Sequence, residues 1–333
     1  MVELDKFKSA KYIMVIGIGG SNLASKAVYE AMTMYKENCE KKVFFLESPD
    51  ERQYEEIESL LKNEIQKKED FSLIAISKSG KTRETLEAFR KTFDILKNKF
   101  SPEEVNERSL VISTKETPLS NIAEKNNIDI LEWENGVGGR FSAFSIAHTA
   151  VLEIAGLDVE GFKSGNRGEE GTNKDRALEF AKKVYRGHEA GLEILDIFIF
   201  NSELETLGKW CRQLLAESLA SITPTISIGP TDLHSMLELY LEKPKSRFTL
   251  FIKSQKEMSG SINDEAYTNT TREYSKRDMP FYEYSMLEIS EKEIGEFMAF
   301  MIASVLELGK LLGVDPYDQP EVDKYKSGMQ GVS

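Results

Sequence analysis

Short apolar runs alternate with longer amphipathic stretches along the first half of the chain. Five runs are rich in β-branched and aromatic residues and bounded by Gly, Ser, Pro or Asp, which predicts strands at 12–17, 43–48, 72–77, 109–114 and 128–133. The amphipathic stretches between them predict helices near 22–37, 50–68, 82–98 and 118–126. This alternation predicts a parallel sheet that is covered on both faces.

The second half repeats the plan less regularly. Strands are expected at 196–201, 222–229, 248–254 and 281–290, and helices at 142–155, 174–191, 203–219, 231–242 and 291–312. The polar, glycine-rich segment 162–175 predicts an exposed connection. We therefore expect an α/β protein with two doubly wound parallel-sheet domains, at 1–150 and 191–333, joined by a helical connection at 151–190.

Charge and composition narrow the class of partner. The chain has 333 residues, with Lys plus Arg at 43 and Asp plus Glu at 56, so its formal net charge is −13. That balance argues against nucleic-acid binding, whereas a small anion needs only local N–H groups and one or two cations. No apolar run approaches the roughly 20 residues of a membrane span, and the N-terminus lacks a signal-peptide pattern. We expect a cytoplasmic protein without a membrane partner.

A glycine-rich segment, VIGIGGSN, follows the first expected strand and precedes a helix. In a doubly wound sheet this is the crevice in which ligands bind. Gly17, Gly19 and Gly20 let the backbone approach an anion closely, and Ser21 adds a hydroxyl donor. The N-terminus of the next helix supplies N–H groups and a positive dipole. The segment is therefore a candidate anion-binding loop.

Two other interpretations of this segment stay open. It partly matches the dinucleotide fingerprint G-x-G-x-x-G, although Asn22 occupies the third glycine position. Glu47, near the end of the second strand, could then mimic the acid that binds ribose. The segment could also be a purely structural tight turn.

A second hydroxyl-rich loop, ISKSGKTRET, follows the third expected strand. Ser77, Ser79 and Thr82 place three hydroxyls within six residues, with Lys78 and Gly80 among them. Hydroxyls and free amides at a helix start suit a monophosphate, and the spacing is not that of a P-loop. Such a cluster is by itself often only a helix cap. Because both loops follow parallel strands at one sheet edge, the phosphate interpretation is favoured.

The segment VGGRFSAFS carries Arg140 in a glycine turn. Gly138 and Gly139 allow a close approach, and the guanidinium can stabilise a developing oxyanion without losing its own proton. The alternative is an ordinary surface arginine.

Candidate acid–base residues lie in the second half. Glu217 is near the end of the helix expected at 203–219, beside apolar Leu215 and Leu219, where a carboxylate suits a general base. Taken alone, a glutamate at such a position is more often an ordinary exposed helix residue. That helix has a core stripe made of Leu207, Trp210, Leu214, Leu215 and Leu219.

Two further motifs carry residues that could move protons or bind the substrate. GPTDLHS predicts a turn and a helix start, with His234 in the first turn, although a lone histidine is often structural. DPYDQPEVDKYK contains Gln319 and predicts a short helix with Lys326, which is by itself an ordinary surface lysine.

Six segments occur together in one order and resemble the signatures of the phosphoglucose isomerase family. They are GIGGS, SKSGKTRET, GGRFSAFS, QLLAESL, GPTDLHS and DPYDQPEVDKYK, and they run from residue 17 to residue 326. The resemblance implies two sugar-isomerase-type (SIS-type) domains, a homodimer, and interconversion of glucose 6-phosphate and fructose 6-phosphate in glycolysis and gluconeogenesis. It implies no cofactor and no metal.

The resemblance also implies a role for each candidate residue. Arg140 stabilises the enediol(ate), Glu217 moves the proton between C2 and C1, and Gln319 lines the site. His234, contributed by the neighbouring subunit, helps Lys326 to open the sugar ring. The sugar phosphate is held by Gly20, Ser21, Ser77, Lys78, Ser79 and Thr82.

The chain departs from the family pattern at several positions. Most members are longer, with an extra N-terminal helical region. Glu238 stands where the family usually has glutamine, and a family glycine and lysine are replaced in SLASI. SKSGKT differs from the commoner SKTFTT and leans towards sugar-phosphate-binding modules and dual phosphoglucose/phosphomannose isomerases, whereas DQP favours the ordinary glucose enzyme. Dual activity, a non-catalytic sugar-phosphate sensor and a nicotinamide-dependent dehydrogenase therefore stay as alternatives.

Overall fold

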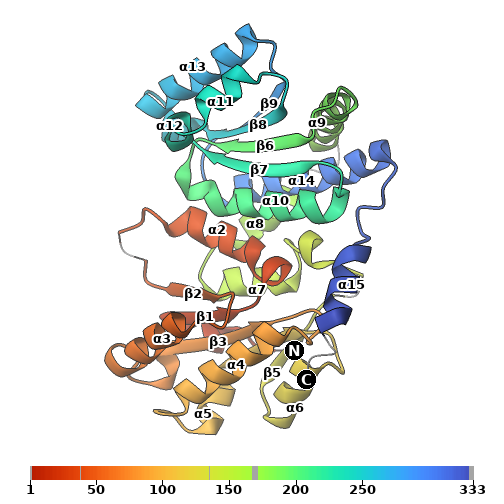
Figure 1. Ribbon diagram of the computed structural model, residues 1–333. Helices are drawn as coiled ribbons and strands as arrows, with labels where there is room; N and C mark the ends of the chain where they lie inside the picture. Colours follow the sequence, from red (N-terminus) through yellow and green to blue (C-terminus); the bar gives the residue numbers. More distant parts are fainter. Residues whose placement is uncertain (1, 38, 135, 167–171, 330–333) are drawn as a thin grey trace. The chain divides into compact units, whose positions relative to one another are not determined.

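The computed structural model describes residues 2–37, 39–134, 136–166 and 172–329. The chain forms two compact units, Met1–Lys163 (unit 1) and Ser164–Ser333 (unit 2), each with helices on both faces of a parallel sheet (Figure 1). The prediction of two doubly wound parallel sheets is therefore confirmed. The domain boundaries expected at 150 and 190 stay a prediction.

Over the described part of unit 1, five parallel strands pair in the order β2-β1-β3-β4-β5. Each lies within about two residues of its expected position because each is a short apolar run with turn residues at its ends. The strands are β1 Tyr12–Ile16, β2 Lys42–Leu46, β3 Phe71–Ile76, β4 Ser109–Ser113 and β5 Asp129–Glu132.

Side chains of β1 alternate between two cores because successive residues of a strand point to opposite faces. Met14 packs in the core with α3 to α6, whereas Val15 packs in the core with α1 and α7. The helical segments of unit 1 are α1 Asp5–Lys8, η1 Gly19–Ser21, α2 Leu23–Thr33, α3 Glu51–Asn63, η2 Lys68–Asp70, α4 Arg83–Leu96, α5 Pro102–Glu107, α6 Pro118–Lys125, η3 Gly139–Phe141 and α7 Ile146–Ile154.

Unit 2 repeats this plan with four parallel strands in the order β7-β6-β8-β9, counted over its described residues. The strand expected at 281–290 ends early, at Met286. The strands are β6 Ile194–Ile199, β7 Thr223–Ile228, β8 Arg247–Ser254 and β9 Phe281–Met286.

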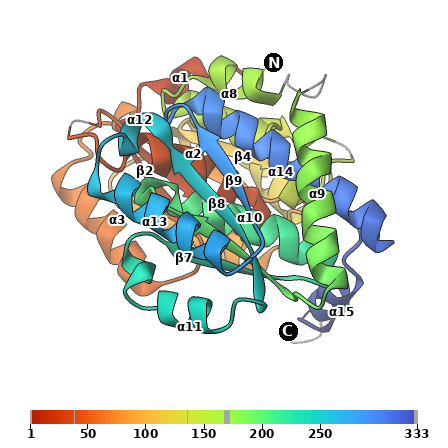
Figure 2. The same ribbon diagram turned by 90° about the horizontal axis from the view of Figure 1, so that it is seen from above.

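The helices of unit 2 cover both faces of its sheet. Figures 1 and 2 show α9, α10 and α14 over one face and α11 to α13 over the other. The segments are α9 Thr172–Glu189, η5 Ser202–Leu204, α10 Glu205–Leu219, η6 Thr231–Leu233, α11 Leu237–Glu242, α12 Gln255–Met258, α13 Ile262–Lys276, α14 Glu291–Leu312 and α15 Pro320–Met329. Helix α8, Val159–Asn166, begins in unit 1 and ends in unit 2, so the connection expected to be exposed at 162–175 is partly helical; its residues 167–171 lie outside the described residues.

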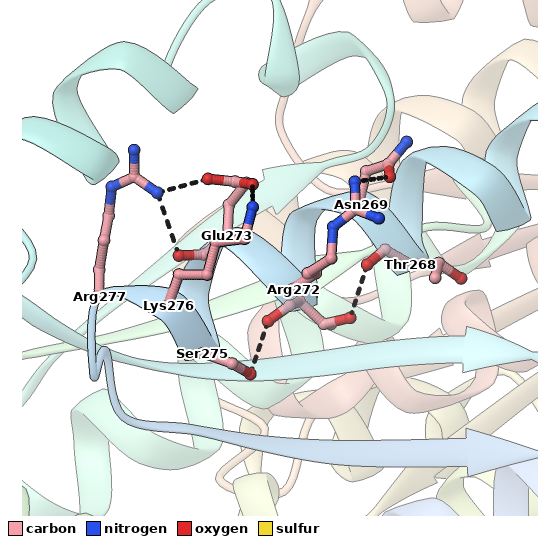
Figure 3. Close-up of polar contacts among 8 residues, drawn as sticks. Thr268, Asn269, Arg272, Glu273, Ser275, Lys276 and Arg277 are labelled. Atoms are coloured by element: carbon pink, nitrogen blue, oxygen red, sulfur yellow. Dashed lines mark hydrogen bonds and ion pairs between the residues drawn. The ribbon is translucent and has the colours of Figure 1, made fainter.

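Helix α13 was not expected from the sequence. Its buried stripe is Tyr267, Thr270 and Tyr274, at helical spacing but without an aliphatic residue, so the apolar periodicity is weak. Ion pairs lie at its C-terminal end: Figure 3 shows Glu273 between Lys276 and Arg277. These two cations lower the pKa of Glu273 to about 2.

The strand orders define a switch point in each unit. In unit 1, β1 and β3 are neighbours whose following helices, α2 and α4, pack on opposite faces. In unit 2 the same relation holds for β6 and β8. Ligands of doubly wound sheets bind outside the carboxyl ends of the strands at such a point. In unit 2, the backbone N–H of Ser254 at the end of β8 donates to Asn201 Oδ1 after β6, at 2.8 Å.

Candidate active site

Both hydroxyl- and glycine-rich loops lie at the switch point of unit 1. The first follows β1 and the second follows β3, and these strands pair in parallel with Ile16 opposite Ala75. A side chain at Gly17 would lie 3.2 Å from the carbonyl oxygen of Ile76, so the two loops start side by side. Their expected proximity is confirmed.

The loop after β3 is shaped by its own hydroxyl groups. Ser77 Oγ accepts a hydrogen bond from Gly80 N–H at 3.1 Å and lies 3.2 Å from Thr82 Oγ1. Gly80 has a φ of +58°, and a Cβ there would clash with Thr117 Oγ1, so only glycine fits. Thr82 precedes α4, yet its side chain makes no capping hydrogen bond. The hydroxyl of Thr82 therefore does not cap helix α4.

The other two residues of this loop are more accessible. Ser79 is exposed, and its Oγ accepts from Lys81 N–H at 3.3 Å. Lys78 is half-buried, and its carbonyl oxygen accepts from the Thr114 hydroxyl at 2.7 Å, which fixes the backbone of the loop. The backbone that carries Lys78 is thus held in place.

Arg140 lies in η3 and is only 5% exposed, so the surface-arginine alternative is wrong. Its guanidinium carbon is 5.4 Å from the centre of the Phe141 ring. The backbone of the turn lies directly against the loop after β1: a Cβ at Gly20 would clash with the carbonyl carbon of Gly139. The glycine at position 20 therefore lets the two turns meet.

His148 holds this contact from within the core and was not among the expected site residues. It is fully buried in α7, and Ser25 N–H donates to its Nδ1 at 3.2 Å. Its Nε2 lies 3.1 Å from the carbonyl oxygen of Gly20 and 3.0 Å from Ser142 Oγ. Burial lowers the pKa of His148 to about 4, which keeps the ring neutral near pH 7.

Glu47, the acid that a dinucleotide site would need, already has partners. Lys26 Nζ forms an ion pair with its Oε2, and Asn22 Nδ2 donates to its Oε1 at 3.3 Å. A carboxylate held by two protein donors is poorly placed to bind a ribose. The dinucleotide interpretation therefore lacks a free acid at Glu47 as well as a glycine at position 22.

Glu217 lies two residues before the end of α10. The expected core stripe of this helix is confirmed, since all five of its apolar residues are buried. Glu217 itself is half-buried, and Gln213 Nε2 donates to its Oε1 at 2.9 Å. The next residue after the helix, Ala220, is in the left-handed region at φ 51°.

The structure corrects the expected helix at 231–242. A 3₁₀ turn ends at Leu233 and α11 begins only at Leu237, so exposed His234 lies between two short segments and not in the first turn of a helix. The reason is Asp232, whose carboxylate accepts from Ile228 N–H at 2.7 Å and from Ser235 Oγ at 2.8 Å. That side chain folds the segment back onto β7.

The last motif leads into α15 as expected. Gln319 is half-buried immediately before this helix, and its backbone N–H donates to Asp318 Oδ1 at 2.8 Å. Lys326 lies within α15, and its side chain falls outside the described residues.

The residues that the structure describes include neither a cluster of metal-binding side chains nor a helix that could span a membrane. Among these residues, no group of three or more His, Cys, Asp or Glu side chains could hold a metal ion. Of the helices that the structure describes, none combines the length and apolar character needed to cross a membrane.

Comparison with known proteins gives consistent results. The phosphoglucose isomerase family model matches residues 4–176. Glucose-6-phosphate isomerase of Methanocaldococcus jannaschii is 30% identical over 97% of this chain and 85% of its own length, and that of Clostridium tetani is 28% identical over 95% and 79%. Among solved structures, a hypothetical protein of Thermus thermophilus superposes with a TM-score of 0.84 at 23% identity, over 98% of this chain and 86% of the other. A glucose-6-phosphate isomerase of Chlamydia trachomatis gives 0.79 at 19%, over 98% and 70%.

Proposed function

This chain belongs to the phosphoglucose isomerase family, and we propose that it interconverts glucose 6-phosphate and fructose 6-phosphate through ring opening and a cis-enediol(ate). The observation that carries the proposal is the pair of loops at the switch point of unit 1, with the buried Arg140 turn against the first of them. An anion site next to a fixed cation suits a sugar phosphate that must also form an oxyanion.

The phosphate group is assigned to the two loops. Ser77 Oγ and Thr82 Oγ1 lie close enough to bond two oxygens of one phosphate, and Gly80 keeps the loop tight. The other ligands are the N–H groups and side chains of Gly20, Ser21, Lys78 and Ser79. Hydroxyls, amides and one lysine are sufficient for a monophosphate.

The proton transfer is assigned to Glu217. Its carboxylate removes the proton from C2 of open-chain glucose 6-phosphate, and the electron pair of that C–H bond forms the C1–C2 double bond while the C1 carbonyl oxygen becomes an oxyanion. The proton of the C2 hydroxyl then passes to the C1 oxygen, Glu217 returns its proton to C1, and the C2–O bond becomes the ketone carbonyl. Arg140, which stays protonated, stabilises the oxyanion throughout. The net change is a 1,2-shift of hydrogen with no oxidant and no cofactor.

Ring opening is assigned to His234 and Lys326, which move protons between the ring oxygen and the C1 hydroxyl, and Gln319 is assigned to the site lining. We further propose a homodimer in which His234 serves the neighbouring subunit. The support is positional: Glu217 precedes β7 and His234 follows it, and six residues of strand span about 17 Å. One copy of unit 2 thus keeps the two groups apart. A cytoplasmic location follows from the glycolytic role proposed.

Two alternatives share this fold and are separated by one assay. A coupled assay with fructose 6-phosphate, in which a dehydrogenase consumes the glucose 6-phosphate, should show turnover by the purified protein. Mannose 6-phosphate in parallel tests the dual phosphoglucose/phosphomannose activity. Binding of fructose 6-phosphate without turnover would instead identify a non-catalytic module and overturn the proposal.

A further inference from the structure

The contact between Gly20 and Gly139 joins two parts of unit 1 that are far apart in the sequence. It brings the loop after β1 against the turn of Arg140, and η1 and η3 pack on each other there. Ser142 Oγ donates to the carbonyl oxygen of Gly139 at 2.6 Å and lies 3.2 Å from that of Gly20. A glycine-to-glycine contact has no side chains to lock it, so its geometry depends on these polar bonds.

His148 supplies the most buried of these bonds. Because Ser25 N–H donates to Nδ1, that nitrogen carries no proton, and the neutral ring bears its hydrogen on Nε2. Nε2–H is then directed to the carbonyl oxygen of Gly20 at 3.1 Å, with Ser142 Oγ also in reach. One imidazole thus ties together the first turn of α2, the loop after β1 and the segment after Arg140.

The surroundings of His148 argue against a role in packing alone. Four other positions of α7 are apolar and pack in the core against β1: Ala147, Ala150, Val151 and Ile154. Burying an imidazole among such residues costs free energy unless its nitrogens are bonded, whereas an aliphatic residue would incur no such cost. Both ring nitrogens are bonded here: Nδ1 accepts from the first turn of α2, and Nε2 faces the loop after β1 and Ser142.

We propose that His148 is a positioning residue of the isomerase, which locks the phosphate loop at Gly20 and Ser21 to the turn that carries Arg140. The inference rests on the function proposed above. With the hydrogen bonds of His148 in place, the groups that hold the substrate's phosphate and its oxyanion stay at a fixed separation. Without them, the two turns shift against each other, and a misplacement near 1 Å costs an enzyme about 100-fold in rate.

Three variants of one residue separate the two bonds. Asn at position 148 places an oxygen where Nδ1 accepts from Ser25 but does not reach Gly20. Gln extends an amide N–H to the position of Nε2. We expect H148A and H148N to lower kcat/KM for fructose 6-phosphate about 10- to 100-fold, partly through KM and partly through kcat, and H148Q to recover most of it.

The matched control is the next residue of the same helix. Thr149 is buried, and its hydroxyl donates to the Ser145 carbonyl oxygen at 3.1 Å, at the start of the same helix. T149A should lower the melting temperature and leave kcat and KM near wild type when both are measured well below that temperature. A merely structural His148 would make H148A and T149A alike at equal loss of stability.

The outcomes distinguish this inference from the proposed function. An inactive wild type refutes the function itself. An active wild type with H148N and H148A equal to it in kcat and KM refutes the positioning role, as does an H148Q no better than H148N. If H148A does not fold, H148N decides, because it keeps the bond to Ser25 that anchors α2.

Discussion

Glu217 and His234 lie beyond opposite ends of the same strand, β7, one before its first residue and the other after its last. The strand fixes their separation because a parallel strand hydrogen-bonded to its neighbour cannot shorten. If both residues act on one substrate, as proposed, this arrangement favours their coming from two copies of the chain.

This relation predicts complementation between two inactive variants. When E217Q and H234A are unfolded together and refolded, half of the dimers are mixed, and each mixed dimer has one intact site if His234 acts across the interface. The isomerase rate should then rise to about a quarter of wild type. Each variant refolded alone is the control. A mixture as inactive as its components would place Glu217 and His234 in the same chain's site.

Glu217 should be essential for turnover and dispensable for binding. E217Q keeps the shape and the neighbour Gln213 but removes the base, so kcat should fall about 10²- to 10⁴-fold while KM changes little. E205Q on the same helix is the matched control, since Glu205 forms an ion pair with the partly exposed Lys209. Equal rates for E217Q and wild type would show that another group is the base.

The hydroxyl of Thr82 should bind the phosphate rather than cap α4. T82V keeps the shape and removes a hydrogen bond to a charged ligand, so KM should rise about tenfold or more with stability nearly unchanged. T92V in the same helix is the control, because Thr92 Oγ1 is buried without a hydrogen-bond partner among the described residues. A loss of melting temperature without a change of KM would restore the capping role.

Replacing Ala220 by glycine should make the protein more stable. Its φ of 51° is costly for a residue with a Cβ, so A220G should stabilise the protein by about 0.5–1 kcal/mol. A216G, at an exposed position inside α10, should destabilise it by about 1 kcal/mol, since glycine weakens a helix interior. Urea unfolding of the pair measures both signs, and a destabilised A220G would contradict the strain.

The buried imidazole of His148 should make the free energy of unfolding depend on pH under acidic conditions. The pKa of His148 is lowered from 6.5 to about 4 by burial, so below pH 6.5 the unfolded chain takes up the proton first and the fold loses stability until about pH 4. The total loss is up to roughly 3 kcal/mol. H148Q lacks this titration, so the difference in unfolding free energy between wild type and H148Q should change over this window and stay level above pH 7.

Much of the fold was predictable because its signals are local. The strands are contiguous apolar runs, and β1 and β3 bring their following loops together simply because they are adjacent and parallel. Helix α13 escaped prediction because its buried stripe is Tyr267, Thr270 and Tyr274. The turn at His234 escaped it because the side chain of Asp232, and not local propensity, ends the helix there.

The residues of the candidate site also divide into those with a local sequence signal and those without one. The loop residues and Arg140 lie in motifs that a reader of the sequence can see, whereas His148 has no local pattern. It lies on an apolar helix, and its partner Ser25 is 123 residues away in the chain. Only the folded backbone brings those atoms within bonding distance. The roles of Glu217 and His234 stay predictions for the experiments above, and those of Gln319 and Lys326 stay predictions as well.

The hydrogen bond between Ser254 N–H and the side chain of Asn201 lies at the switch point of unit 2. An amide hydrogen that is bonded to a side chain is not available to a ligand. Strand order around the switch point is the same in both units, β2-β1-β3 in one and β7-β6-β8 in the other. The described residues thus contain one strand arrangement twice. In unit 1 the loops after the two central strands are proposed to bind the substrate, whereas in unit 2 the amide of Ser254 at the corresponding edge is already bonded within the protein.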